Sequence, residues 1–311
     1  MSFEISVAIP AYNRADYLKE TLESVLSQTF PPSEIFVVDD GSTDNTPDVI
    51  ASYGSRIRSL RIENSGAGIA RKIAAESTSG SWLAFCDSDD IWLPHHLERR
   101  VNLLKKNPDI NFSFSDLEPF GPASRPGQTY FSDAPNDWWQ QFGDCKDNYI
   151  LMGRNAYKSF LVYNPGSPVT TLMTRELYNS IGGIDARYSR MVAEDADMAR
   201  KAVLYGNVLC DLTVTAKQRR HVGNMSAQTL YNLLGKIKIL QDHLDLEIAP
   251  PELHIDITQA IQNTYQDAFL AAYYAESKQE AQSIVNKLGF TNLSLKDKLR
   301  YILLITKNIK I

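Results

Sequence analysis

The sequence predicts an α/β fold, in which a mostly parallel central sheet is flanked by helices and followed by a C-terminal helical appendage. Short β-branched runs alternate with amphipathic helical stretches through residues 5–104, a pattern typical of a parallel sheet covered on both faces. Acidic residues directly follow two of these runs, where such sheets bind their ligands. From residue 225 onward, apolar residues recur at helical spacing.

The first half of the chain contains four strand patterns, each followed by a helical one. Ile5 to Pro10 is a β-branched run closed by proline, and Leu18, Leu22 and Val25 follow it at helical spacing. The same alternation continues along this half. We expect strands at residues 5–10, 35–38, 58–62 and 82–86, and helices at residues 18–26, from 46, 67–75 and 97–104.

The second half is less regular. Residues 116–170 are rich in proline, glycine and aromatic residues, and this composition predicts a long irregular insertion. Helices are expected at residues 175–181 and 195–205. We therefore expect two domains, a main domain at residues 1–224 and a helical region at residues 225–311.

Composition excludes several functional classes. The chain has 311 residues, 43% of them hydrophobic and 22% charged, which is the balance of a folded globular protein. The net charge of −5 and the lack of a long basic run before residue 210 argue against binding to nucleic acid. The three cysteines are widely spaced, which predicts core thiols rather than a disulfide framework.

The N-terminal residues carry neither a basic patch nor an apolar stretch of signal-peptide length, so a cytoplasmic location is expected. The longest apolar run near the C-terminus, Tyr301 to Thr306, is too short to span a bilayer. The expected location is therefore the cytoplasm, with the inner membrane face as a possible site of peripheral contact.

The sequence Asp87-Ser88-Asp89 places two carboxylates one residue apart at the end of a predicted strand. Carboxylate oxygens in this arrangement suit Mg²⁺ or Mn²⁺, which takes few protein ligands and completes its shell with water and phosphates. Acidic turns of this form also occur simply as helix caps before a proline, so the tripeptide alone leaves both interpretations open.

Four ordered motifs extend this observation. They are Ala8 to Arg14 (AIPAYNR), Val37 to Thr46 (VVDDGSTDNT), Asn64 to Gly66 with Ala70 and Arg71, and Asp87 to Pro94 (DSDDIWLP). Together they resemble glycosyltransferase family 2, an inverting family with the GT-A fold, over residues 4 to about 225. The resemblance implies a GT-A type fold and an inverting glycosyltransferase, with the catalytic domain at residues 1–224. The helical region at residues 225–311 would then contact an acceptor, a membrane surface or another subunit.

The resemblance also implies roles for residues on the donor side. Pro10, Ala11 and Tyr12 would border the nucleobase, Asp40 would contact it, and Asp39 would support that loop. Asp87 would face the ribose or sugar, and Asp89 would be the principal metal ligand, with Asp87 and His221 also near the metal or phosphates. The expected donor-binding residues are thus Pro10, Ala11, Tyr12, Arg14, Asp40, Gly66, Arg71, Asp87 and Ser88.

On the acceptor side, the segment with Gly183 and Asp185 and the pair Glu194-Asp195 resemble the family's acceptor segment and its ED motif. Asp195 would then be the catalytic base. Inversion by direct displacement requires a carboxylate that takes the proton of the acceptor hydroxyl. Taken alone, Glu194 and Asp195 also suit a helix N-terminus, where acidic side chains complement the dipole.

The expected reaction moves one sugar from a nucleotide diphosphate donor, a UDP-sugar, to a hydroxyl of a glycan, glycolipid or glycoprotein. Its setting would be the biosynthesis of bacterial-type surface polysaccharide or glycoconjugate. Mn²⁺ or Mg²⁺ is the expected cofactor, and nucleic acid is not an expected partner. Lys72 stands where many relatives have asparagine after the Ala-Arg pair, a departure close to the predicted donor-binding Arg71. The Gln-x-x-Arg-Trp signature of processive synthases is missing, so a single transfer is expected.

Residues 294–311 interleave lysine and arginine with leucine and isoleucine. A basic amphipathic helix of this kind can lie on an anionic membrane surface. It can equally pack on its own domain or on a second subunit, so peripheral membrane contact and a homo-oligomer both stay open.

Three alternatives compete with a glycosyltransferase. The first two are a nucleotidyltransferase on a similar sheet and a protein that binds sugar nucleotides without turnover. The third is a dinucleotide-dependent oxidoreductase, suggested by Gly66 to Arg71 (GAGIAR), but this run has arginine in place of the last glycine and follows the third predicted strand rather than the first.

Overall fold

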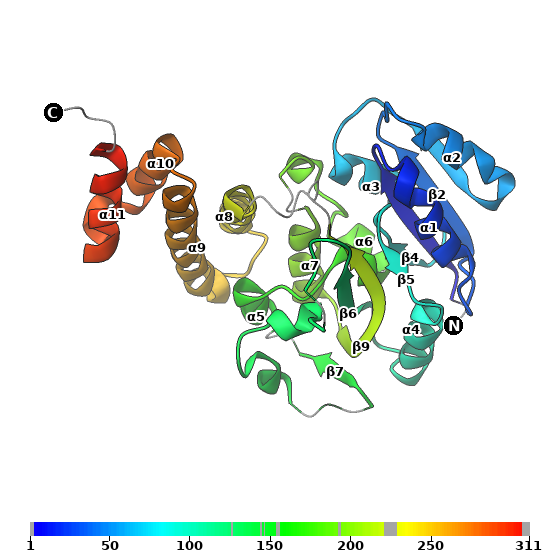
Figure 1. The fold of residues 1–311 in the computed structure, drawn as a ribbon. Coiled ribbons are helices and arrows are strands. Elements are labelled where there is room, and N and C mark those ends of the chain that lie inside the picture. The colour runs from blue at the N-terminus through cyan, green and yellow to red at the C-terminus, as the bar shows by residue number, and fades with distance from the viewer. Residues whose placement is uncertain are drawn as a thin grey trace. The chain divides into compact units, whose positions relative to one another are not determined.

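The computed structural model describes residues 3–125, 127–143, 145, 147–153, 156–191, 194–220 and 229–306. The chain divides into two compact units, one of residues 1–190 and 194–224 and one of residues 191–193 and 225–311 (Figure 1). The roles predicted for the two domains, catalysis for the first and contacts with other molecules for the second, stay predictions.

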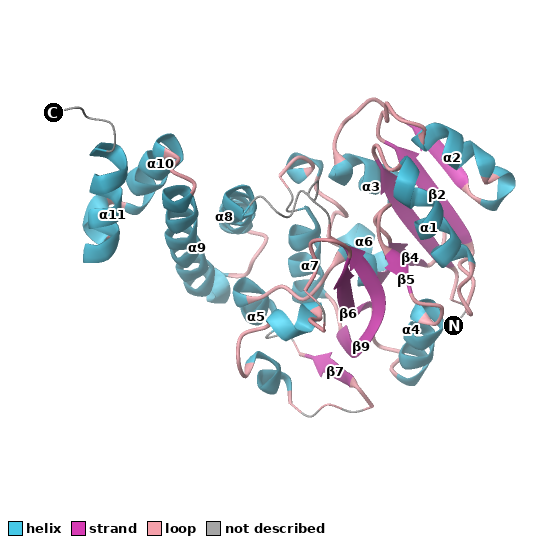
Figure 2. Ribbon diagram, in the orientation of Figure 1, coloured by secondary structure: helices cyan, strands magenta, loops and turns pink. Residues whose placement is uncertain are grey.

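The strands of the described residues form one sheet, with the order β3-β2-β1-β4-β8-β6-β9-β5 and with β7 beside β9 (Figure 2). The strands are β1 Ile5–Ala11, β2 Glu34–Asp39, β3 Arg58–Arg61, β4 Trp82–Phe85, β5 Ile91–Trp92, β6 Phe112–Phe120, β7 Tyr149–Met152, β8 Leu172–Thr174 and β9 Val208–Arg219. Strands β1 to β4 pair in parallel, as the alternating pattern predicts.

Strand β1 shows why this half of the sheet forms. All seven of its residues are buried, because β2 and β4 lie on either side of it and helices flank the sheet. A strand covered on both faces reads as a continuous apolar run, and ISVAIPA is such a run. Its last residue, Ala11, pairs with Asp39, so β1 and β2 end together.

The other half of the sheet is mixed. Strand β8 runs antiparallel to both β4 and β6, whereas β6 and β9 are parallel to each other. Residues 116–170, predicted to be irregular, contain the end of β6, strand β7 and helix α5 Ala156–Val162. That prediction is wrong for these elements, because β6 and β7 pair with β9, far along the chain, and local composition carries no record of the pairing.

The helices of the first unit follow the predicted stripes. In α1, for example, Leu18, Leu22 and Val25 are buried on one side. Gly66 is the N-cap residue of α3 and has a φ of 96°, a conformation that other residues rarely adopt. The helices are α1 Ala15–Leu26, α2 Thr46–Ser52, α3 Ala67–Glu76, α4 His96–Lys106, α5, α6 Arg175–Ser180 and α7 Glu194–Tyr205.

The second unit is helical in the residues that the structure describes. Its helices are α8 Thr229–Asp245, α9 His254–Tyr274, α10 Lys278–Leu288 and α11 Leu295–Thr306. Among the described helices, none combines the length and the apolar character needed to cross a membrane.

Two of the three cysteines lie in the interior. Cys86 and Cys210 are buried free thiols, as predicted, and burial raises the pKa of each thiol well above its usual value. The prediction of a core thiol is wrong for Cys145, which is exposed in the loop before β7.

Candidate active site

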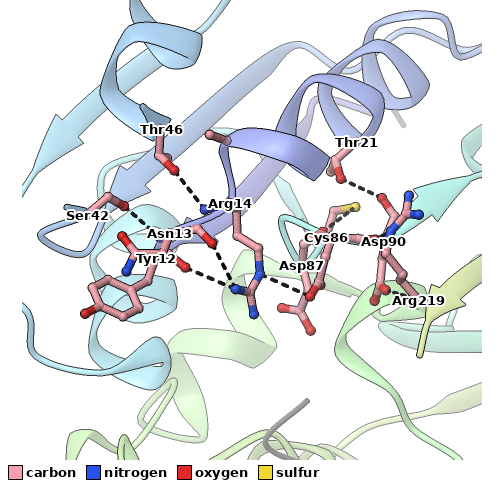
Figure 3. Close-up of polar contacts among 12 residues, drawn as sticks. Tyr12, Asn13, Arg14, Thr21, Ser42, Thr46, Cys86, Asp87, Asp90 and Arg219 are labelled. Carbon is pink, nitrogen blue, oxygen red and sulfur yellow. Dashed lines mark hydrogen bonds and ion pairs between the residues drawn. The ribbon is translucent and has the colours of Figure 1, made fainter. Parts of the chain in front are cut away.

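The parallel strands bring three predicted segments to one edge of the sheet. The backbone N–H of Asp40 donates to the carbonyl of Ala11 (2.8 Å), which joins the ends of β2 and β1. The backbone N–H of Cys86, the residue after β4, donates to the carbonyl of Ala8 (3.2 Å). The loops that follow β1, β2 and β4 therefore meet at this edge, as the rule for open α/β sheets predicts. Figure 3 shows Tyr12, Arg14 and Asp87 together there.

The Asp40 carboxylate holds the loop that leads into α3. Its Oδ1 accepts from the backbone N–H of Ser65 (2.7 Å) and its Oδ2 from that of Gly66 (2.9 Å). Asp39 performs a similar task in its own turn, where Oδ1 accepts from the N–H of Ser42 (2.9 Å). Both side chains are buried. Asp40 thus fixes the loop geometry, and its contact with a nucleobase stays a prediction.

The residues after β1 differ in how open they are. Pro10 and Ala11 are buried in the strand, whereas Tyr12 is exposed beside it. The ring of Tyr12 is therefore accessible to a planar ligand such as a base, and Pro10 and Ala11 shape the backbone beneath it.

Arg14 forms an ion pair with Asp89, the predicted principal metal ligand. Its Nε donates to Oδ2 of Asp89 (3.1 Å). Its Nη1 donates to the carbonyls of Asn13 (3.1 Å) and Tyr12 (3.3 Å) (Figure 3). These contacts join the loop after β1 to the Asp87-Ser88-Asp89 turn. Ser88 and Asp89 are both buried. The resemblance places Arg14 at the donor, whereas its observed contacts are with the acidic turn.

Arg219, at the end of β9, supports the same turn from the other side. Its Nε donates to the carbonyl of Asp89 (3.0 Å), and its backbone N–H donates to Oδ1 of Asp90 (2.8 Å). The guanidinium lies 4.7 Å from the ring centre of Tyr17 and 4.4 Å from that of Phe120. Arg219 has no predicted role of its own, and its place two residues before His221, which is predicted near the metal or phosphates, was the only signal. His221 itself lies outside the described residues.

Arg71 joins the donor and acceptor motifs. Its Nη2 donates to Oδ1 of Asp87 (2.6 Å), and its Nη1 forms a short ion pair with Oε1 of Glu194. Arg71 and Glu194 are 5% and 6% exposed. Burial alone would lower the pKa of Arg71, but the carboxylates of Asp87 and Glu194 raise it above its usual value. The guanidinium therefore stays charged between two acids that lie far apart in the sequence.

Glu194 lies at the start of α7 and has Arg71 as a partner. The resemblance places Glu194 on the acceptor side, but its carboxylate is buried and bound to Arg71. Its role on the acceptor side stays a prediction. Its observed role is to attach the start of α7 to the end of β4.

Asp195 follows Glu194 in the first turn of α7 and is partly exposed. Its Oδ1 accepts from the backbone N–H of Ala196 (2.7 Å). The pKa of Asp195 is raised to about 7, first by desolvation and then by the nearby charge of Glu194, while Arg71 acts in the opposite direction. A carboxylate with a pKa near neutrality is well suited to accept a proton from an alcohol as a bond forms.

The remaining predicted residues of the acceptor side form a turn before α7. Gly183 has a φ of 63°, and a Cβ at this position would lie 2.8 Å from the ring of Tyr178. Asp185 caps a short 3₁₀ helix and pairs with Arg187 (2.6 Å). Both residues are explained by the turn itself. Their contact with an acceptor stays a prediction.

Ser189 connects this turn to α3. Its Oγ accepts from the backbone N–H of Ile69 (2.7 Å) and donates to the carbonyl of Ser65 (3.2 Å). A Cβ on Gly68 would lie 2.7 Å from Cα of Ser189, so the close approach requires glycine. The run GAGIAR, considered above as a dinucleotide motif, therefore has a packing explanation in this chain.

The acidic turn fits a divalent cation that takes few protein ligands. Among the described residues, no three histidine, cysteine, aspartate or glutamate side chains are arranged to hold a metal. Asp87 and Asp89 supply oxygen donors at one strand end, which suits Mg²⁺ or Mn²⁺ when phosphates and water provide the other ligands. A cation at Asp89 would share or replace the contact of Oδ2 with Arg14.

Truncation of Arg71 is expected to destabilise the protein. Arg71→Ala would remove the guanidinium that pairs with Glu194 and Asp87, and breaking a buried ion pair costs about 3 kcal/mol or more. The free energy of unfolding from urea denaturation measures the effect. Lys106→Ala is the matched control, because Lys106 forms an exposed pair with Asp147 and should change stability by less than about 1 kcal/mol. Equal effects of the two substitutions would contradict the structural role of Arg71.

Comparison with solved structures identifies the fold. The fold resembles that of S. aureus TarS residues 1–349 in complex with UDP-GlcNAc, with a TM-score of 0.63 and 17% identity over 98% of this chain and 80% of that chain. It also resembles mannosyltransferase PcManGT from Pyrobaculum calidifontis in complex with GDP-Man and Mn²⁺, with a TM-score of 0.57 and 18% identity over 99% of this chain and 88% of that one. At such identities the likeness shows the fold alone, and it confirms the predicted GT-A type fold.

Sequence comparison gives the family. Residues 6–156 match the model described as glycosyl transferase family 2, and this part of the chain belongs to that family. The UDP-Glc:alpha-D-GlcNAc-diphosphoundecaprenol beta-1,3-glucosyltransferase WfgD of Escherichia coli is 38% identical over 116 residues, which are 37% of this chain and 46% of WfgD. The chain spans between 15% and 46% of the length of the curated relatives that it matches.

Proposed function

We propose that this protein is an inverting glycosyltransferase that moves one sugar from a UDP-sugar to an acceptor hydroxyl. The observation that carries the proposal is the connection of Asp195 to the acidic turn: Asp195 has a pKa of about 7 and adjoins Glu194, which binds Asp87 through Arg71. A base and a diphosphate site held in one rigid frame are what direct displacement requires.

The reaction follows from these positions. The acceptor oxygen forms a bond to the anomeric carbon as the bond from that carbon to the diphosphate oxygen breaks. The bonding electrons leave with the nucleoside diphosphate, and the acceptor proton passes to the carboxylate of Asp195. The displaced group departs on the face opposite the incoming oxygen, which inverts the anomeric centre.

Other residues of the chain would bind the donor and the metal. The exposed ring of Tyr12 would contact the nucleobase of the donor. Asp40 holds the loop at Gly66 in place. Asp87 and Asp89 would hold Mg²⁺ or Mn²⁺, which when bound supplies positive charge to the departing diphosphate. Arg71 and Arg14 keep these two carboxylates in position.

The family and the relatives support the choice of donor and acceptor. The name of WfgD gives UDP-Glc as donor and a diphosphoundecaprenol-linked sugar as acceptor, and the TarS structure contains UDP-GlcNAc. We propose by analogy a hydroxyl of a glycan, glycolipid or glycoprotein as acceptor, in the biosynthesis of surface polysaccharide or glycoconjugate. The reaction would take place on the cytoplasmic side, at or near the inner membrane face.

A screen of sugar nucleotides tests this function. With Mn²⁺ present, UDP-sugars should raise the melting temperature more than GDP-sugars or dTDP-sugars, since the donor that binds most tightly stabilises the native state most. A ligand at a hundredfold excess over its Kd stabilises the native state by about 2.7 kcal/mol. The stabilising donor should then be hydrolysed slowly or transferred. Stabilisation without turnover would favour a sugar-nucleotide-binding protein, and stabilisation by nucleoside triphosphates alone would favour a nucleotidyltransferase.

A further inference from the structure

Helix α11 has two apolar sides. One of them packs against the other helices of the second unit. Tyr301 and Leu304 are buried. The ring of Tyr301 lies 6.4 Å from that of Phe269 in α9, and its hydroxyl bonds to Gln282 of α10. The side with Tyr301 and Leu304 therefore fixes the helix to its own unit, as one interpretation of the sequence predicts.

The opposite side of α11 exposes large apolar residues. Leu295 and Leu299 are 86% and 58% exposed, and Ile302 and Leu303 are exposed as well. These four residues are spaced by four, three and one positions, so they share one face of the helix. We call them the apolar stripe. Scattered exposed leucines are ordinary, but four on one helical face mark a contact surface.

Positive charge flanks the apolar stripe. At 3.6 residues per turn, Lys296 and Lys298 lie on either side of the line through Leu295 and Leu299. Lys298 also donates to the carbonyl of Thr291 (3.0 Å), which keeps its ammonium near the edge of the stripe. Residues 294–311 contain five basic residues and one acidic residue, in a chain whose net charge is −5. The apolar stripe therefore belongs to a segment with a net positive charge in a chain with a net negative charge.

We propose that the apolar stripe lies on the surface of a bilayer that contains anionic phospholipids, with Lys296 and Lys298 at the level of the headgroups. A helix of 12 residues is about 18 Å long, so it suits the interface and cannot span the membrane. The charge pattern favours lipid over a second copy of the chain, because two copies joined through the stripe would bring like charges together.

This inference goes beyond the proposed transfer reaction and is tested separately from it. Binding to vesicles requires neither donor nor acceptor, so an inactive protein could still bind lipid, and an active transferase could fail to bind it. The two results would separate the membrane contact from the catalytic function.

The test uses the full chain and sedimentation with vesicles of phosphatidylcholine, alone or mixed with phosphatidylglycerol. The wild-type protein should bind the mixed vesicles at least about tenfold more tightly, and added salt should weaken this binding. The double variant Leu299→Asp/Ile302→Asp should lose at least about tenfold in affinity, since it places two charges in the stripe.

Ile255→Asp is the matched control. Ile255 is 83% exposed on α9, outside the apolar stripe, so the same change from apolar to acidic should leave vesicle binding unchanged. Equal binding to both kinds of vesicle, no binding at all, or full binding by the double variant would overturn the proposal. A dimer in solution that the double variant abolishes, without vesicle binding by the wild type, would assign the stripe to a second copy instead.

Discussion

Asp195→Asn is expected to lower kcat by at least about 10²-fold while leaving donor binding nearly unchanged. The amide keeps the size of the side chain and its contact with the backbone N–H of Ala196, but it cannot accept the acceptor's proton. Steady-state kinetics and calorimetric titration with the donor measure the two quantities. A variant with full activity would show that another group is the base.

The pH dependence gives a second measure of the same base. Asp195 acts only when deprotonated, and its pKa of about 7 lies well above the usual value for aspartate. In the wild type, log kcat/KM should therefore rise with a slope of one up to about pH 7 and level off above it. Asp48→Asn, which alters an exposed aspartate in α2, should reproduce the wild-type profile. A profile that is flat from pH 5 to 8 would contradict the assignment.

Asp89→Ala is expected to remove the metal-dependent part of donor binding, a loss of more than about tenfold in affinity. Asp89 supplies one of the two carboxylates of the acidic turn, and alanine offers no oxygen to a cation. Donor titrations with Mn²⁺ and with a chelator give the metal-dependent difference directly.

Asp16→Ala is the control for this substitution. Asp16 is an exposed aspartate in the first turn of α1, close in the chain to Arg14. Its substitution should leave the difference in donor affinity between Mn²⁺ and chelator unchanged. If Asp89→Ala retains the full difference between Mn²⁺ and chelator, the metal is held elsewhere. Loss of donor binding in the presence of chelator as well would indicate that Asp89 acts mainly through its pair with Arg14.

The first half of the fold was predictable because its signals are local. The runs at residues 5–10 and 35–38 are apolar over their whole length, and the structure has β1 and β2 there. The strands of the mixed half of the sheet have weaker signals in the sequence. Strand β5 has two residues and β8 has three, too few to show any period.

The arrangement of the candidate site was predictable only in outline. Parallel strands end at one edge, so the segments with Asp40 and Asp87 had to meet there. Three contacts had no local signal: Arg71 with Glu194, Arg14 with Asp89, and Arg219 with the carbonyl of Asp89. Each joins residues at least 75 positions apart.

By itself the sequence determined the alternation of strands and helices, the acidic turn at residues 87–89 and the family, because period and motif spacing are properties of neighbouring residues. The tertiary structure alone decided that Glu194 is buried against Arg71, that Asp195 has a pKa near 7, and that one side of α11 stays exposed. Burial and ion pairing depend on which distant residues pack together, and these in turn set a carboxylate's affinity for a proton.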